Sequence, residues 1–109
     1  MQPDIKEEIK ADIATNKVIL YMKGTKSEPS CGFSSQVVTI LNTLGIDYVT
    51  RNVLEDDALR TAIKEHSNWP TLPQLYIDGE FIGGCDIVTQ LYESGDLTAK
   101  LEAINAKER

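Results

Sequence analysis

The apolar run KVILYM at residues 17–22 is the feature that most restricts how this chain folds. It is unbroken, it is rich in β-branched and aromatic side chains, and it ends before Gly24. A strand with one face in water would alternate apolar and polar residues, so an unbroken run indicates a strand covered on both faces. We therefore expect the central strand of a sheet, within a single domain that spans residues 1–109.

Helices are expected on both sides of this strand in the sequence. The first is indicated by isoleucines at every fourth position in a charged background, and it ends near Thr15. The second begins after Cys31 and ends at Gly45, because glycine readily terminates a helix. The side chains expected to face inward are Ile5, Ile9 and Ile13 in the first helix, and Phe33, Val37, Ile40, Leu41 and Leu44 in the second.

A strand and a third helix follow. Residues 46–53 alternate well enough for a short strand, and the order strand, helix, strand is typical of a right-handed unit with parallel strands. Asp56 or Asp57 is expected to cap the third helix. That helix should end before Asn68, because the residue preceding Pro70 avoids the helical region. Its inward side chains are expected to be Leu59, Ala62 and Ile63.

The segment QLYIDGEFIGG, residues 74–84, predicts a β-hairpin, because Asp78-Gly79 suits the type I′ turn that joins two adjacent strands. Asp86 is then expected to cap a helix, and Asp96 to start the last one. Their inward side chains should be Ile87, Val88, Leu91 and Tyr92, followed by Leu97, Leu101 and Ile104. The order α-β-α-β-α-β-β-α-α resembles the thioredoxin superfamily, which implies an α/β fold with a four-stranded mixed sheet and about five helices.

Charge and hydropathy exclude two kinds of partner. The net charge is −6 and the 11 basic residues are scattered, so the chain lacks the basic stripe of a protein that binds nucleic acid. No apolar run approaches the ~18 residues that span a bilayer, so no membrane association is expected. The first residues, MQPDIKEEIK, lack the features of a secretory signal. These observations predict a cytoplasmic location.

Cys31 is the residue most suited to chemistry. It lies where a loop enters a helix, so backbone N–H groups and the positive end of the helix dipole should face its sulfur and favour the thiolate. Lys23 is placed to reinforce this effect. The alternative is a small buried cysteine, but the neighbouring Pro29, Ser30 and Gly32 favour an exposed loop. Such a thiolate would be a nucleophile or a metal ligand.

The segments YMKGTKSEPSCGFS and WPTLPQLYIDGEFIGGCDI, in this order and spacing, resemble the monothiol glutaredoxins of the Cys-Gly-Phe-Ser class. The resemblance runs from the first helix to about Tyr92, which is nearly the whole chain. In this class Ser34 stands where dithiol relatives have a second cysteine, so it should matter through the disulfide that it prevents. The resemblance implies a glutaredoxin fold and a glutathione groove beside Cys31.

The same resemblance implies which residues hold glutathione. Lys23 and Arg60 would bind the glycine carboxylate, the Leu72 backbone would pair with the cysteinyl part, and Cys85 and Asp86 would hold the γ-glutamyl end. This is chemically sensible, because glutathione needs cations at one end and an anion with free N–H donors at the other. Supporting residues around them would be Gly32, Phe33, Ser34, Trp69, Pro70, Thr71, Pro73 and Gly84, with Pro73 expected to be cis.

Cys85 leaves three alternatives open. It is a resolving thiol for Cys31, a separate redox sensor, or a small buried residue whose backbone alone matters. A disulfide with Cys31 requires a Cα separation below roughly 7 Å. The interpretation that we favour is the backbone role.

Counting ligands favours an iron–sulfur cluster. A [2Fe–2S] cluster takes four terminal ligands, and one chain offers Cys31. Two chains and two glutathione thiolates would complete the set, which agrees with the glutathione-ligated cluster that the resemblance implies at a homodimer, for transfer to acceptor proteins. The resemblance also implies a complex with a BolA-like protein. The alternative is an enzyme, a glutathione-dependent thiol–disulfide oxidoreductase that removes glutathione from proteins. A third hypothesis is an interaction scaffold with a vestigial site.

Overall fold

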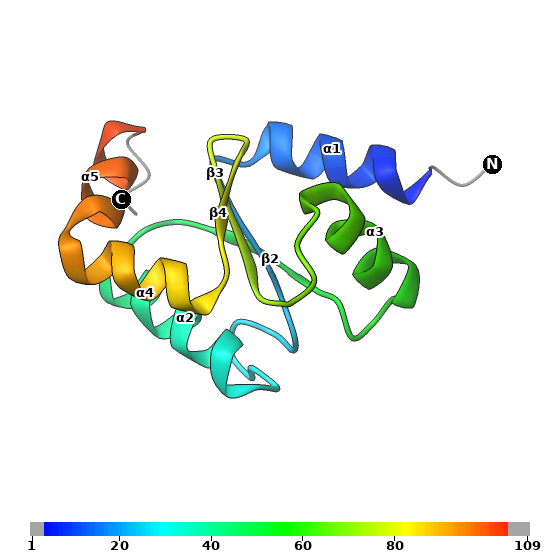
Figure 1. Ribbon diagram of the computed structural model, residues 1–109, viewed down its shortest axis with the longest axis horizontal. Helices are drawn as coiled ribbons and strands as arrows, with labels where there is room; N and C mark the ends of the chain where they lie inside the picture. The colour runs from blue at the N-terminus through cyan, green and yellow to red at the C-terminus, as the bar shows by residue number, and fades with distance from the viewer. Residues whose placement is uncertain (1–3, 105–109) are drawn as a thin grey trace.

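A four-stranded sheet in the order β2-β1-β3-β4 forms the centre of the protein, and helices cover both of its faces (Figure 1). The computed structural model describes residues 4–104. β1 pairs with β2 in parallel and with β3 antiparallel, and β3 and β4 form the antiparallel hairpin. The mixed sheet and five helices expected from the sequence are confirmed. The elements are α1 Ile5–Thr15, β1 Val18–Met22, α2 Gly32–Thr43, β2 Val49–Asn52, α3 Asp57–Ser67, β3 Gln74–Ile77, β4 Glu80–Gly83, α4 Cys85–Ser94 and α5 Asp96–Ala103.

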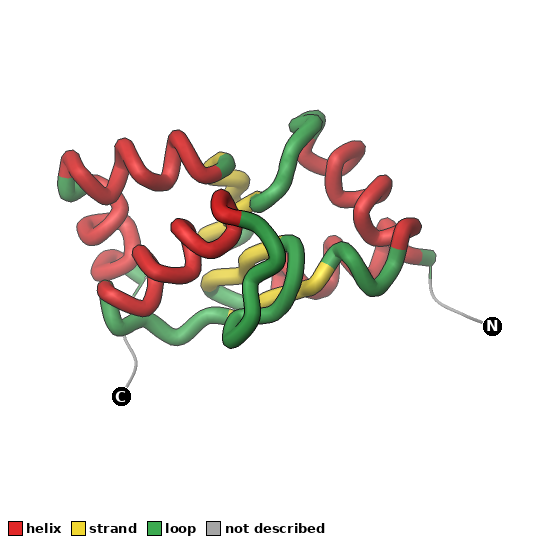
Figure 2. The backbone as a smooth tube through the Cα atoms, turned by 90° about the horizontal axis from the view of Figure 1, so that it is seen from below, coloured by secondary structure: helices red, strands yellow, loops and turns green. Residues whose placement is uncertain are grey.

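β1 supplies side chains to two hydrophobic cores. Val18, Leu20 and Met22 point to the core formed with α2, α4 and α5, whereas Ile19 and Tyr21 point to the core formed with α1 and α3. Helices lie on both sides of the strands in Figure 2 as well. All five side chains are buried, and each of the four apolar ones, Val18, Ile19, Leu20 and Met22, contributes about 1.5–3 kcal/mol to folding by leaving water. The predicted central strand is therefore confirmed.

The ends of the elements follow from local chemistry. The Asp56 carboxylate accepts hydrogen bonds from the first turn of α3, so it is the cap among the two candidates. α3 ends because Asn68 adopts the left-handed conformation, with φ 55°. Asp78 and Gly79 both have positive φ, as a type I′ turn requires. α5 begins at Asp96 as expected.

Four expectations about these elements were wrong. Ile87, expected to face inward, is only partly buried and lines a surface cavity instead of joining either core. Phe33 is 63% exposed instead of facing the core, because it lies in the first turn of α2 and projects beyond the packed part of that helix. Asp86 does not cap α4; Gly84 occupies the cap position without a side-chain hydrogen bond, and Asp86 lies in the first turn. β2 is shorter than residues 46–53, because only residues 49–52 pair with β1.

Candidate functional site

Cys31 occupies the N-cap position of α2, as the sequence predicted. Its backbone is extended, with φ −149° and ψ 155°, and its Sγ accepts a hydrogen bond from the Ser34 N–H at 3.4 Å. The Ser34 Oγ lies 3.3 Å from the same sulfur. The thiol therefore lies among hydrogen-bond donors at the start of a helix, where negative charge is stabilised.

Ser34 interacts with this sulfur directly, which sequence reasoning did not anticipate. Its side chain is fully buried, and its Oγ accepts a hydrogen bond from the Lys23 N–H at 3.1 Å. A hydroxyl has one proton to donate, and a Cys31 thiolate is the acceptor next to it. Ser34 thus connects the end of β1 to the sulfur through its hydroxyl group.

The surroundings lower the pKa of the Cys31 thiol. Burial of the sulfur acts in the opposite direction and raises the pKa. Hydrogen bonds from the Ser34 hydroxyl and from the Ser34 and Phe33 N–H groups, together with the charge of Lys23, outweigh it. The thiolate is therefore more populated near neutral pH than in an ordinary cysteine.

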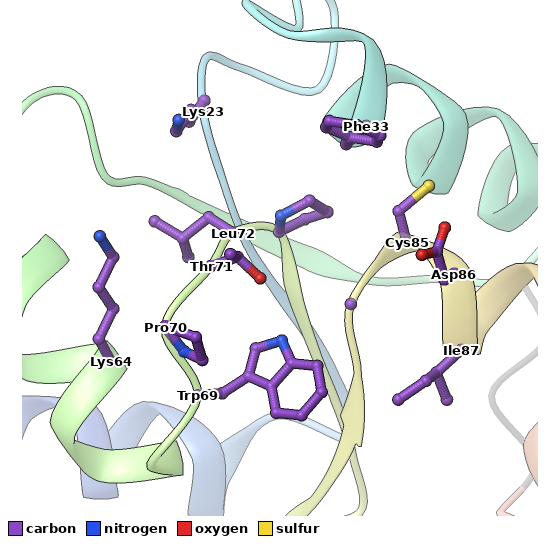
Figure 3. A pocket seen from close by; sticks show the side chains of 12 residues that line it. Lys23, Phe33, Lys64, Trp69, Pro70, Thr71, Leu72, Cys85, Asp86 and Ile87 are labelled. Atoms are coloured by element: carbon purple, nitrogen blue, oxygen red, sulfur yellow. The ribbon is translucent and has the colours of Figure 1, made fainter.

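A cavity of about 410 Å³ lies between the start of α2, the segment 69–73 and the start of α4 (Figure 3). Of the site residues predicted from the sequence, all but Cys31, Gly32, Ser34 and Arg60 line it. Phe33, two residues after Cys31, forms part of the wall. The lining residues are Lys23, Phe33, Lys64, Trp69, Pro70, Thr71, Leu72, Pro73, Gly84, Cys85, Asp86 and Ile87.

Charges of opposite sign stand on opposite sides of this cavity. Lys23 follows β1 and Lys64 comes from α3, whereas Asp86 stands across from both at the start of α4 (Figure 3). Arg60, which was expected at this end, pairs instead with Asp57 at 3.7 Å on the exposed surface of α3. Sequence reasoning missed Lys64, although it lies one helical turn after Arg60 and so on the same face of α3.

A buried glutamine holds the segment that forms the cavity floor. The Gln74 Nε2 donates to the carbonyl oxygens of Trp69 and Thr71, each at 3.2 Å. The Leu72–Pro73 peptide bond, which lies between Thr71 and Gln74, is cis, as the resemblance implied. Gln74 is fully buried, so these bonds form away from water. The sequence did not indicate that the Gln74 side chain holds this segment, because the pattern predicts only that Gln74 is the first residue of a strand.

The comparisons with known proteins agree with this arrangement. Residues 18–82 match the glutaredoxin family model. The chain belongs to the glutaredoxin family. It is 50% identical over 106 residues to the uncharacterized monothiol glutaredoxin ycf64 of Porphyra purpurea, covering 97% of this chain and 99% of that one. Relatives from Oryza sativa and Danio rerio carry names that place them in the chloroplast and the mitochondrion.

Solved structures show that the fold is thioredoxin-like. The solution structure of reduced apo GrxS14 from poplar has a TM-score of 0.81 and 49% identity, covering 94% of each chain. The crystal structure of a buckwheat glutaredoxin–glutathione complex has a TM-score of 0.85 and 25% identity, covering 95% of this chain and 93% of that one. Together with the Cys31 and Ser34 pair, these likenesses make this chain a monothiol glutaredoxin.

The second cysteine of this glutaredoxin is poorly suited to attack Cys31. Cys85 is 8% exposed, and its sulfur points toward α2 (Figure 3). Burial raises the pKa of its thiol, and negative charge on Asp86 or Cys31 raises it further. Both cysteines are free. A thiol with a raised pKa is a weak nucleophile, which favours the backbone role among the three alternatives.

A small residue is required where the loop to Cys31 leaves β1. Gly24 has φ +94°, and a Cβ there would lie 2.5 Å from the Ser30 nitrogen and 2.6 Å from the Glu28 oxygen. We predict that Gly24→Ala lowers the free energy of unfolding by about 3 kcal/mol, measured by urea unfolding. Gly79→Ala is the matched control, since Gly79 also has positive φ but no atom within 4 Å. Equal losses for the two variants would contradict the predicted clash.

Proposed function

We propose that this monothiol glutaredoxin binds glutathione and carries a [2Fe–2S] cluster between two copies of the chain, for delivery to acceptor proteins. The observation that carries the proposal is the pairing of one thiol of lowered pKa, Cys31, with an adjacent cavity whose opposite sides carry opposite charges. The cluster is cargo here, received and passed on. We take residues 1–109 to act as one glutaredoxin domain.

The cavity suits glutathione in size and in charge. Its volume of about 410 Å³ is in the range of pockets for small molecules. Lys23 and Lys64 on one side suit the glycine carboxylate, while the Asp86 carboxylate on the other side suits the ammonium group. The N–H groups at the start of α4, where Gly84 supplies no capping side chain, suit the γ-glutamyl carboxylate. The buckwheat glutaredoxin crystallised with glutathione supports this assignment.

The roles of Leu72 and Arg60 in glutathione binding stay predictions. Leu72 precedes the cis bond on the cavity floor, where its backbone is available for strand-like pairing with the cysteinyl part. Arg60 must leave Asp57 to reach the ligand, and an exposed ion pair of this kind contributes at most about 1 kcal/mol. Rotation of Arg60 toward the cavity is therefore inexpensive.

The donor set supports a cluster shared between chains. A [2Fe–2S] cluster takes four terminal ligands, usually thiolates. Within residues 4–104, no three His, Cys, Asp or Glu side chains gather as a metal site. Cys31 is a partly exposed thiol with a lowered pKa, so it can be one ligand. Two Cys31 thiolates and two glutathione thiolates complete the four, which makes glutathione and a second chain part of the site.

Anaerobic reconstitution with iron, sulfide and glutathione tests the proposal. We expect visible absorption of a [2Fe–2S] cluster together with a doubled mass in size-exclusion chromatography, and neither when glutathione is left out. Iron and sulfide analysis should give about one cluster for two chains. A cluster formed in full yield without glutathione, or one bound to a single chain, contradicts the proposal.

A second candidate function, thiol–disulfide exchange with glutathione, is favoured by the lowered pKa of Cys31 alone. Ser34 cannot release a mixed disulfide by intramolecular attack, so turnover would depend on a second glutathione. A reductase-coupled assay distinguishes the two, since rapid turnover favours the enzyme. The BolA-like partner and the cytoplasmic location stay predictions. Among the described residues, no helix is long and apolar enough to cross a membrane.

A further inference from the structure

Residues 24–30, here called the 24–30 loop, close on themselves through backbone hydrogen bonds. Gly24 forms an isolated antiparallel bridge with Pro29, and the Thr25 N–H donates to the Glu28 carbonyl at 3.2 Å. The Ser30 N–H donates to the Lys23 carbonyl at 2.9 Å. Because both ends of the loop are joined in this way, a displacement of Gly24 carries Ser30, and hence Cys31, with it.

Asn52, the last residue of β2, holds the base of this loop. Its Oδ1 accepts hydrogen bonds from the Gly24 N–H and from the Leu54 N–H, each at 3.0 Å. Gly24 is buried, and the backbone atoms of the loop fill the space around its Cα. A buried N–H that loses its acceptor is costly, so the side chain of Asn52 determines where Gly24 rests.

The backbone of Lys23 is fixed from three directions. Its N–H donates to the Ser34 Oγ at 3.1 Å, and its carbonyl accepts from the Ser30 N–H. The next N–H along the chain, that of Gly24, donates a hydrogen bond to the Asn52 Oδ1. Lys23 is therefore held between the start of α2 and the end of β2. The tip of the loop has its own anchor, since the Lys26 Nζ donates to the Tyr48 carbonyl at 2.8 Å.

We propose that Asn52 is a positioning residue for the glutathione site: through Gly24 it fixes Lys23 and the 24–30 loop, so that glutathione meets a preformed site. This inference rests on the glutathione binding proposed above. Asn52 itself does not line the cavity, and it acts through the backbone on either side of Lys23. A preformed site binds more tightly because no loop has to be ordered on binding.

Two substitutions of Asn52 distinguish the effect of its acceptor oxygen from the effect of its size. Asn52→Leu removes the oxygen but keeps the size, and Asn52→Asp keeps an acceptor oxygen. Asn16→Leu is the control for general destabilisation, because Asn16 makes its side-chain bond to the Asp12 carbonyl at the end of α1. Two measurements are made on each: amide hydrogen exchange of Gly24 and Ser30 by NMR, and the glutathione Kd by calorimetry.

For Asn52→Leu we expect exchange at both Gly24 and Ser30 to accelerate at least about tenfold, and the Kd to rise about tenfold. Asn52→Asp should restore the protection of both amides, and Asn16→Leu should leave the Kd unchanged. Acceleration confined to Gly24, or an unchanged Kd in Asn52→Leu, overturns the positioning role. If the unaltered protein does not bind glutathione, the proposed function fails, whereas the exchange data still report whether Asn52 holds the loop.

Discussion

Replacing Cys31 with serine is expected to abolish both the mixed disulfide with glutathione and cluster binding. A serine hydroxyl does not ionise near neutral pH, so the variant loses the only partly exposed thiol among the described residues. After anaerobic reconstitution, we expect the visible absorption per chain to fall to the level of a protein-free control. Intact mass after treatment with oxidised glutathione should show no added glutathione.

Cys85→Ser is the matched control for this loss. The Cys85 thiol is buried and its pKa is raised, whereas the N–H groups at the start of α4 survive the substitution. We therefore expect cluster yield and glutathione addition close to those of the unaltered protein. A Cys85→Ser variant that loses as much cluster as Cys31→Ser would show that Cys85 is a ligand and that the ligand count given above is wrong.

The fold was predictable where local sequence determines local structure. The run at residues 17–22 specified a strand buried on both faces, and Asp78-Gly79 specified the hairpin, because both depend on short-range backbone and side-chain preferences. Helical periodicity failed at Phe33, since it gives the face of a residue but not whether the helix packs along its whole length. The capping preference of aspartate failed at Asp86, because Gly84 occupies the cap position and α4 already begins at Cys85.

The residues of the candidate site were predictable from the sequence motif, but the hydrogen bonds that hold them in place were not. The sequence gives Lys23 and the Trp69–Pro73 segment a place in a known pattern, and the structure brings them to one cavity. The bonds that hold these pieces join segments far apart in the chain. Asn52 reaches Gly24 across 28 residues, and no periodicity or composition indicates such a contact.

Ser34 shows the same limit in the residue closest to the chemistry. As a sequence letter it marks the absence of a second thiol. In the structure its hydroxyl oxygen accepts a hydrogen bond from the Lys23 N–H and lies 3.3 Å from the Cys31 sulfur. Ser34 therefore favours the Cys31 thiolate in two ways. It cannot form a disulfide with Cys31, and its hydroxyl can donate a hydrogen bond to the thiolate.

Ser34→Ala is therefore expected to slow the reaction of Cys31 with iodoacetamide by up to about tenfold at a pH below both pKa values. The lost hydrogen bond to a charged group contributes about 1.5 kcal/mol, and each 1.4 kcal/mol is about a tenfold change. Since the hydroxyl helps to lower the pKa of Cys31, its removal raises that pKa, and the rise in alkylation rate with pH moves to higher pH.

The pH dependence separates this effect from simple damage to the fold. At a pH well above both pKa values Cys31 is a thiolate in either protein, so the deficit of Ser34→Ala should disappear there, and its thiolate should react at least as fast. Peptide mass mapping assigns the modification to Cys31, because Cys85 carries the second thiol. Ser34→Thr keeps the hydroxyl and should retain the lower midpoint. If Ser34→Ala and the unaltered protein share one pH profile, the Ser34 hydroxyl does not stabilise the thiolate.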